Sequence, residues 1–311
     1  MLSVIIPTLN AGREMEHLLD ILKRQELTVP YDETEAVEII VADSESTDKT
    51  VEIAARYGAK IIPVCRAEYD HGGTRNLAWR QAKGDFIFFL TQDAVPVDEH
   101  YLQNFLDAFV EEDIVMISGR QIPKKDANPV ERLTREFNYP KDSFVRDASA
   151  VATMGIKAYF FSDACAVYRR SFLEEMGGFE NPIPTNEDML MAARALKKGY
   201  KVGYCAAAQV YHSHNFTLKQ QYKRNFDVAA FMEMYRDEIC SEGTTGEGIR
   251  MVLYTEKQLF LHGHFGSMFR CVFESGAKFL GNRAGRKYRF MTAEQILKKT
   301  SNPGYWRKNG V

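Results

Sequence analysis

The stretch Gly84–Pro96, GDFIFFLTQDAVP, decides the fold, because an apolar run of five residues leads into a polar turn and a carboxylate. Residues 86–90 (FIFFL) are apolar at every position, which is typical of a strand buried on both faces of a parallel sheet. In open sheets of this kind, ligands bind outside the carboxyl ends of the strands. The sequence therefore predicts that Asp93 lies at a ligand site.

Short apolar runs alternate with helical patterns on both sides of this stretch. Strands are predicted at residues 2–10, 37–44, 59–64, 85–93, 113–121, 158–168 and 201–215, and helices at residues 13–25, 48–57, 74–83 and 186–200, the last stopped by Gly199. This alternation predicts the α/β class, with a Rossmann-like, mainly parallel sheet covered by helices on both faces. Residues 138–153 are predicted to form a surface loop.

The C-terminal part has a different pattern. Beyond about residue 216 only helical spacing remains, and we expect a catalytic domain at 1–226 and a helical, basic segment at 227–311. Residues 270–311 hold ten Lys/Arg against two Asp/Glu, although the whole chain carries a net charge of −2. An apolar helix at 256–280 with this basic end predicts peripheral contact with a membrane. The alternative is a helix packed on the catalytic domain with a solvated basic end.

The composition also bears on location and partners. Five cysteines show no CxxC spacing, and no apolar run resembles a signal peptide or a membrane span. We therefore expect a cytoplasmic protein, peripheral on the inner face of the cell membrane. A nucleic-acid partner is not expected, because no nucleic-acid-binding module precedes the basic segment.

Polar residues follow several predicted strands. Neither GxGxxG nor GxxxxGK[ST] is present. Asp43 can accept hydrogen bonds from a base or ribose, and Asp93 can hold a divalent cation, since Mg²⁺ often takes only one or two carboxylates. Ser46 and Thr47 have an alternative role as helix caps.

Three further motifs carry candidate chemistry. DHGGTRN (residues 70–76) is either a glycine turn with Thr74 as the helix cap, or a turn that offers His71 and Arg75 to phosphate or sugar. Residues 186–188 (NED) place acids at a helix start, where the dipole favours them, or beside an acceptor cleft. His212 and His214, two apart at a strand end, point to one side of it.

The segments SVIIPTLN, VADSESTDKT, GGTRNLAWRQAKGDFIFFLTQDA, GGFENPIPTNEDMLMAARALKKGYKV and VYHSHN together resemble the family-2 glycosyltransferases of the GT-A fold, over residues 2–226. DHGGTRN followed by TQDA is similar to the bacterial rhamnosyltransferases, which use dTDP-L-rhamnose to build cell-surface polysaccharide. The resemblance implies an inverting enzyme, a nucleotide-sugar donor, a divalent cation (Mg²⁺ or Mn²⁺) and a polyprenyl-linked glycan acceptor.

The resemblance also implies a role for each site residue. It assigns the nucleotide-sugar site to Thr8, Asn10, Asp43, Glu45, His71, Arg75 and Gln92. It assigns the metal to Asp93 with His212, or with His214 as second choice. Asp188 matches the general base of the family, and Glu187 supports the acceptor side.

One departure keeps alternatives open. The usual Asp-x-Asp pattern has Thr91 in place of its first acid, which weakens the expectation of strict metal dependence. A UDP-hexose donor on the same fold, or a nucleotide-sugar-binding scaffold without catalysis, are the rival hypotheses.

Overall fold

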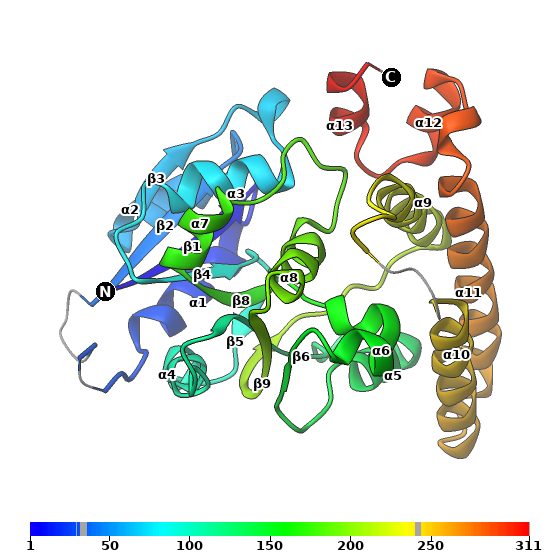
Figure 1. Ribbon diagram of the computed structural model, residues 1–311, viewed down its shortest axis with the longest axis horizontal. Coiled ribbons are helices and arrows are strands. Elements are labelled where there is room, and N and C mark those ends of the chain that lie inside the picture. Colours follow the sequence, from blue (N-terminus) through cyan, green and yellow to red (C-terminus); the bar gives the residue numbers. More distant parts are fainter. Residues whose placement is uncertain (29, 32–35, 240–243, 311) are drawn as a thin grey trace.

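One mixed sheet forms the centre of the protein in the computed structural model (Figure 1). The structure describes residues 1–28, 30–31, 36–239 and 244–310. Within these ranges the sheet has nine strands: eight run in the order β3-β2-β1-β4-β8-β6-β9-β5, and the ninth, β7, pairs with β9. The strands are β1 (Leu2–Thr8), β2 (Val37–Asp43), β3 (Lys60–Pro63), β4 (Phe86–Leu90), β5 (Val95–Pro96), β6 (Ile114–Ile122), β7 (Phe144–Arg146), β8 (Cys165–Arg169) and β9 (Lys201–Tyr211).

The first half of the sheet is parallel. Strands β1, β2, β3 and β4 pair in parallel, β8 runs antiparallel between β4 and β6, and β6 pairs in parallel with β9. The short strands β5 and β7 pair antiparallel with β9. The α/β class predicted from the sequence is confirmed, and the carboxyl ends of β1, β2 and β4 meet at one edge.

Helices cover both faces of this sheet and continue beyond it. They are α1 (Gly12–Lys23), α2 (Thr50–Arg56), α3 (His71–Trp79), α4 (Tyr101–Asp107), α5 (Pro129–Asn138), α6 (Ala150–Met154), α7 (Arg170–Met176), α8 (Glu187–Lys197), α9 (Leu218–Met234), α10 (Thr244–Leu261), α11 (Phe265–Gly285), α12 (Ala293–Lys299) and α13 (Pro303–Lys308). Three short 3₁₀ turns are η1 (Arg66–Glu68), η2 (Gly155–Tyr159) and η3 (Tyr288–Phe290).

Alternation along the buried strands divides the core in two. In β1, Val4 and Ile6 join a cluster with α1 and α4, whereas Ile5 joins the opposite cluster with α3, α7 and α8. All three side chains are fully buried. A strand that buries both faces in this way must be apolar at every position, which explains the continuous apolar runs in the sequence.

Two predicted segments differ from the structure. Residues 138–153, predicted as a surface loop, contain β7 and the start of α6. The buried Arg146 of β7 donates to the carbonyl oxygens of Lys157, Ala158 and Phe160, a tertiary contact with no local sequence signal. The strand predicted at 158–168 is confined to β8, because η2 occupies residues 155–159.

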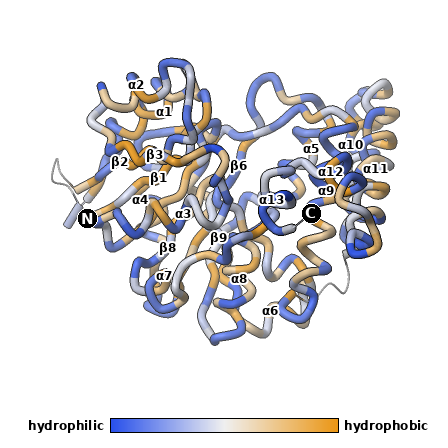
Figure 2. The backbone as a smooth tube through the Cα atoms, turned by 90° about the horizontal axis from the view of Figure 1, so that it is seen from above, coloured by the Kyte–Doolittle hydropathy of each residue, from blue (hydrophilic) through white to orange (hydrophobic). Residues whose placement is uncertain are grey.

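The C-terminal helices pack on the sheet domain through α9. Gly281 and Gly285 of α11 lie against α9, where an added Cβ would come within 2.2 Å of the carbonyl oxygens of Tyr222 and Phe226. Figure 2 shows hydrophobic residues on the central strands and again along α10 and α11 at the margin of the molecule. The boundary expected at residue 226 falls inside α9, which runs without interruption.

The described cysteines, Cys65, Cys165, Cys205 and Cys271, are free thiols, and Cys240 lies outside the described residues. No helix in the part of the chain that the structure describes combines the length and apolar character that crossing a membrane requires.

Candidate active site

The turns after β1 and β2 are joined by side-chain hydrogen bonds. Thr8 stands opposite Asp43 in the register, and its Oγ1 donates to Asp43 Oδ1 over 3.1 Å. Asp43 also accepts from the backbone nitrogen and hydroxyl of Ser46, at 2.9 and 2.5 Å. The buried carboxylate therefore holds the floor of the site in place.

Two residues of these turns adopt left-handed backbone conformations. Asn10 has φ +52° and Glu45 has φ +59°. Asn10 donates its backbone N–H to Ser46 Oγ and accepts from the backbone of Thr47, both at 2.8 Å, while Glu45 is exposed. The alternative role of Ser46 and Thr47 as caps of the next helix is not observed, because α2 begins only at Thr50, whose N–H donates to Asp48.

A pocket of about 490 Å³ lies above this floor. Its lining includes four of the residues expected at the nucleotide-sugar site: Thr8, His71, Arg75 and Gln92. The Gln92 amide accepts from the Leu9 N–H at 2.7 Å and donates to the Leu9 carbonyl at 3.2 Å, so it builds the wall between β1 and β4.

Sequence reasoning missed another lining residue, Ser44. Its hydroxyl is buried and has no hydrogen-bond partner in the described part of the chain. A buried polar atom without a partner is costly, so its position favours a polar ligand in this pocket. Ser44 lies in the DSEST segment directly after Asp43, and this position at a strand end was the sequence feature that could have identified it.

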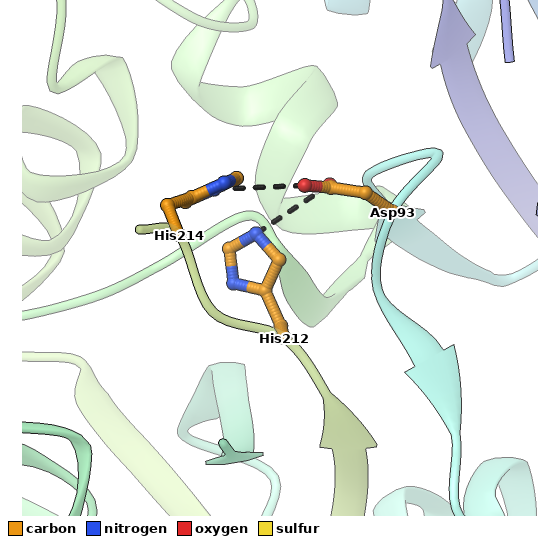
Figure 3. Close-up of side chains that lie close together, drawn as sticks. All are labelled: Asp93, His212 and His214. Atoms are coloured by element: carbon orange, nitrogen blue, oxygen red, sulfur yellow. Dashed lines mark ion pairs between the residues drawn. The ribbon is translucent and has the colours of Figure 1, made fainter. Parts of the chain in front are cut away.

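Asp93, His212 and His214 converge beside this pocket from the ends of β4 and β9 (Figure 3). His212 Nε2 lies 3.4 Å from Asp93 Oδ1, and His214 Nε2 lies 3.6 Å from Asp93 Oδ2. The three ligand atoms all lie within 4.8 Å of one another. The predicted trio is therefore assembled, with both histidines present.

The surroundings of His212 fix which ring nitrogen faces Asp93. Gln121 Oε1 accepts from Arg135 and lies 2.8 Å from His212 Nδ1, while the Gln121 amide nitrogen donates to Ser162 Oγ. The Nδ1 atom is therefore the donor, and Nε2 of the neutral ring presents its lone pair to Asp93. The lone pair of His212 and the carboxylate of Asp93 face each other, an arrangement that fits a cation between them.

The protonation states agree with this arrangement. Burial alone would raise the pKa of Asp93, but the neighbouring His212 and His214 lower it overall, so its carboxylate is charged. Burial and the neighbouring His212 lower the pKa of His214 to about 4, and burial lowers the pKa of His212. Neutral imidazoles with a charged carboxylate are the forms that bind a divalent cation.

A second cluster surrounds the start of α8. Arg75 Nε lies 2.9 Å from Asp163 Oδ2, and its Nη1 lies 2.9 Å from Glu187 Oε1. All three side chains are buried. Arg75 was expected to face the diphosphate, yet its charge is already engaged by two carboxylates. Asp163 was not predicted from the sequence, because it lies within an apolar run that resembles a plain strand.

Asp188 adjoins this cluster. Its Oδ2 accepts the backbone N–H of Asp163 at 3.0 Å, and its Oδ1 accepts the N–H of Met189 at 2.7 Å. Burial, followed by the charges of Glu187 and Asp163, raises the pKa of Asp188 well above the ordinary range. Such a carboxylate binds a proton more strongly than an exposed one, which suits a general base.

The DHGGTRN motif positions the irregular segment before α8. Asp70, not Thr74, caps α3, accepting from Gly73 N at 2.8 Å, and its other oxygen accepts from Ile183 N at 3.0 Å. A Cβ on Gly72 would lie 2.0 Å from the Glu180 carbonyl oxygen. Gly72 therefore allows a close approach to the backbone of Glu180, within the protein itself. His71 lies on the pocket side, and burial lowers its pKa.

Arg224 of α9 is a further functional candidate. Its guanidinium lies over the Phe216 ring at 4.7 Å, and Phe216 stacks on His214. In the described part of the chain, no hydrogen bond or ion pair engages this guanidinium, and its surface is exposed. The site therefore holds a cation that is free to meet an anionic ligand.

The C-terminal end of the described chain completes the pocket. Buried Asp227 of α9 accepts from Thr300 Oγ1 at 2.6 Å, Ser301 N at 2.7 Å and Trp306 Nε1 at 3.2 Å. These bonds hold residues 300–306 so that Asn302 and Gly304 line the pocket. No sequence signal predicted this return of the chain to the sheet edge.

The fold and the site define a glycosyltransferase of the GT-A class, with a nucleotide-sized pocket at the sheet edge and a basic carboxylate beside it. Residues 3–177 match the model of glycosyl transferase family 2, and the chain belongs to that family. The family and the enzyme class predicted from the sequence are both confirmed.

Two curated relatives cover nearly the whole chain. It is 36% identical to the O-antigen chain rhamnosyltransferase of Salmonella anatum, over 98% of this chain and 95% of that protein. It is 37% identical to the corresponding rhamnosyltransferase of Salmonella typhimurium, over 98% of this chain and 96% of that protein.

Solved structures share the fold. A mannosyltransferase of Pyrobaculum calidifontis, solved with GDP-Man and Mn²⁺, matches with a TM-score of 0.62 at 15% identity, covering 92% of this chain and 87% of that one. The TarS protein of S. aureus, solved with UDP-GlcNAc, matches with a TM-score of 0.53 at 16% identity, covering 93% and 91%.

Proposed function

We propose that this glycosyltransferase transfers L-rhamnose from dTDP-L-rhamnose, with inversion, to a lipid-linked glycan in cell-surface polysaccharide synthesis. The observation that carries the proposal is the 36% and 37% identity to two O-antigen chain rhamnosyltransferases along nearly the whole chain. The assembled site provides a place for each part of the reaction.

The nucleotide of the sugar donor occupies the pocket between β1, β2 and the C-terminal turn. Thr8 and Ser44 line it, and Ser44 offers an unpaired hydroxyl. Asp43 and Asn10 hold the turns that carry them through hydrogen bonds, and Glu45 belongs to the second of these turns. Figure 1 places the ends of β1 and β2 on the side of the sheet that faces α13. Specificity for the thymine base is assigned to this pocket as a whole.

Asp93, His212 and His214 are proposed to hold a divalent cation, Mg²⁺ or Mn²⁺. When bound, such a cation neutralises charge on a diphosphate leaving group. Arg224 adds a positive charge on the same side, as its exposed guanidinium lies close to His214 through Phe216. Thr91 supplies no carboxylate, so a single acid serves the site.

Asp188 is proposed to take the proton from the acceptor hydroxyl. In an inverting displacement this base acts from the face of the sugar opposite the leaving diphosphate, and Asp188 is not part of the Asp93 cluster. Glu187 and Asp163 hold Arg75, and they also keep Asp188 basic. Arg75 and His71 lie between this cluster and the pocket.

The C-terminal helices are proposed to contact the inner face of the cytoplasmic membrane. Helices α10 and α11 form a hairpin (residues 244–285), and large apolar side chains near the turn between them remain exposed: Phe260, Leu261, Phe265, Phe269, Val272 and Phe273. Exposed apolar surface of this extent marks an interaction site. The net charge of +8 in residues 270–311 suits an anionic lipid surface.

The proposed sugar donor is tested by thermal shift with dTDP, UDP and GDP, each with and without Mg²⁺ or Mn²⁺, because a ligand that binds the folded state raises its stability. We expect dTDP with metal to give the largest increase in melting temperature. We also expect the enzyme to transfer radiolabelled rhamnose from dTDP-L-rhamnose to a lipid-linked acceptor. A larger shift with UDP would instead support the UDP-hexose alternative.

A further inference from the structure

Two adjoining hollows lie between the catalytic part and the C-terminal hairpin. The inner hollow, about 480 Å³, is lined by Met189, Met232, Arg236 and other residues of η2, α8, α9 and α11. The outer hollow, about 650 Å³, is lined by Ile249, Leu253, Phe279 and other residues of α10 and α11. Both are lined by Asn282 and Arg286, so they form one groove that no step described above uses.

The outer hollow combines apolar walls with unpaired cations. Four cations line it: Lys278 and Arg283 of α11, and Arg286 and Lys287 directly after that helix. None of the four makes a side-chain hydrogen bond or ion pair with any residue that the structure describes. A groove with an apolar wall and a cluster of free cations fits a ligand with a long hydrocarbon chain and a strongly anionic group.

The inner hollow differs in character and leads toward the catalytic base. Glu233, Arg236 and Asn282 supply hydrogen-bond donors and acceptors, which suit sugar hydroxyls. Met189 also lines it, and its backbone N–H donates to Asp188 Oδ1 at 2.7 Å. The polar end of the groove therefore adjoins the residue proposed to accept the proton.

We propose that this groove binds the lipid-linked acceptor. The outer hollow holds the polyprenyl chain, the cations around Arg286 hold its diphosphate, and the inner hollow guides the glycan toward Asp188. This inference rests on the proposed function, since it names the site of that reaction's second substrate. An anionic phospholipid also fits the cations, but it would not use the polar inner hollow beside Asp188.

Direct binding tests the groove without any transfer reaction. Farnesyl diphosphate, a short soluble polyprenyl diphosphate, is titrated into the full chain and followed by calorimetry. We expect Arg283→Ala/Arg286→Ala to weaken this binding at least tenfold, and Lys257→Ala/Lys298→Ala, which removes the same charge outside the groove, to leave it unchanged. Farnesol and inorganic diphosphate, each with half of the ligand's chemistry, should bind more weakly.

The binding experiment has a clear contrary result. Unchanged affinity of the Arg283/Arg286 variant for farnesyl diphosphate would overturn the proposal. The proposal would also be overturned if this variant lost binding to phosphatidylglycerol vesicles but still bound farnesyl diphosphate. That result would assign the cations to phospholipid.

Kinetics separate the groove from the exposed hairpin end. Leu253→Ser/Phe279→Ser alters two exposed groove residues, and Phe265→Ser/Phe269→Ser alters two similarly exposed residues outside it. We expect the groove variant to raise KM for a polyprenyl-diphosphate glycan about tenfold, and to leave KM unchanged for the same glycan on a short alkyl chain. Equal losses with both acceptors would overturn the proposal. If the wild type transferred to neither acceptor, the proposed function would fail, and the binding experiment would still decide the groove.

Discussion

Asp188 shares a small buried space with Asp163, Glu187 and Arg75, so its proton affinity depends on all three neighbours. Two carboxylates disfavour its charged form, while one guanidinium favours it. This arrangement allows a carboxyl group to act as a base near neutral pH without a histidine.

Replacing Asp188 by Asn should abolish transfer but keep nucleotide binding. The amide preserves the size of the side chain and removes the base, whose contribution is about 10²–10⁴ in rate. The measurement is the transfer rate at saturating sugar donor, together with the dissociation constant for dTDP. A variant with near wild-type transfer would assign the proton to another group.

The acid side of the pH profile should lie well above about 4, where an ordinary Asp titrates. The reason is that the pKa of Asp188 is raised by burial and by Glu187 and Asp163. The transfer rate should increase as the pH rises through that pKa, because only the deprotonated base is active. A rate independent of pH across the acid range would contradict this.

Asp93→Ala should remove metal-assisted nucleotide binding. No other carboxylate in the described chain joins the cluster with His212 and His214. We expect the affinity for dTDP to become the same with and without Mg²⁺, measured by calorimetry. Asp98→Ala, at an exposed carboxylate, is the matched control and should retain the metal effect.

At this scale the sequence placed Asp93, His212 and His214 after strand ends and Asp188 at a helix start, and the structure brings the first three together. Their roles as metal ligands and base, which the family resemblance implied, stay predictions. The sequence did not predict that Arg75 is engaged by Asp163 and Glu187. Ion pairs between residues far apart in the chain depend on tertiary packing, which local patterns do not encode.

Helix α3 and the segment before α8 depend on each other at the scale of elements. Asn76 of α3 donates to the Phe179 carbonyl at 2.8 Å and accepts from the Phe179 N–H at 2.8 Å. Together with Asp70, it holds an irregular segment that leads to Glu187 and Asp188. The segment that leads to Glu187 and Asp188 is thus shaped by a helix on the pocket side.

Gly72→Ala should disrupt this contact. The new Cβ would lie 2.0 Å from the Glu180 carbonyl oxygen, so the segment must move, at a cost of about 1–3 kcal/mol in unfolding free energy. Transfer should fall as well. Denaturant unfolding measures the first effect and the sugar-transfer assay the second.

Gly276→Ala is the matched control for this prediction. Its Cβ would meet nothing within 4 Å on α11, so the change should stabilise the protein by about 0.5–1 kcal/mol. Equal destabilisation by both substitutions would show that the contact with Glu180 is not the cause.

Elements whose apolar residues repeat with a clear helical period were predicted well. An example is α8, which ends before Gly199 as the sequence predicted. The segment at 138–153 was not predicted well, because β7 is short and gains its hydrogen bonds only by pairing with β9. A three-residue strand carries too few positions for an alternating pattern.

At the scale of the whole molecule, Asp227 links α9 to the C-terminal turn that lines the nucleotide pocket. Asp227→Asn should lower the unfolding free energy by about 1–3 kcal/mol, because buried donors lose a charged partner. It should also weaken dTDP binding, because Asn302 and Gly304 would no longer be held. Thermal unfolding and calorimetry measure the two effects, and Asp142→Asn, at an exposed carboxylate, is the control. Unchanged dTDP affinity would show that the turn does not contribute to the pocket.

The pocket joins residues 7–9 to residues 302–304, about 300 positions along the chain. During translation, the strand that carries Thr8 leaves the ribosome long before Asn302 does. A nascent chain therefore lacks one wall of its proposed nucleotide site until residue 304 has left the ribosome. Full affinity for the sugar donor should appear only in chains that have reached this length, which couples the onset of binding to completion of this part of the polypeptide.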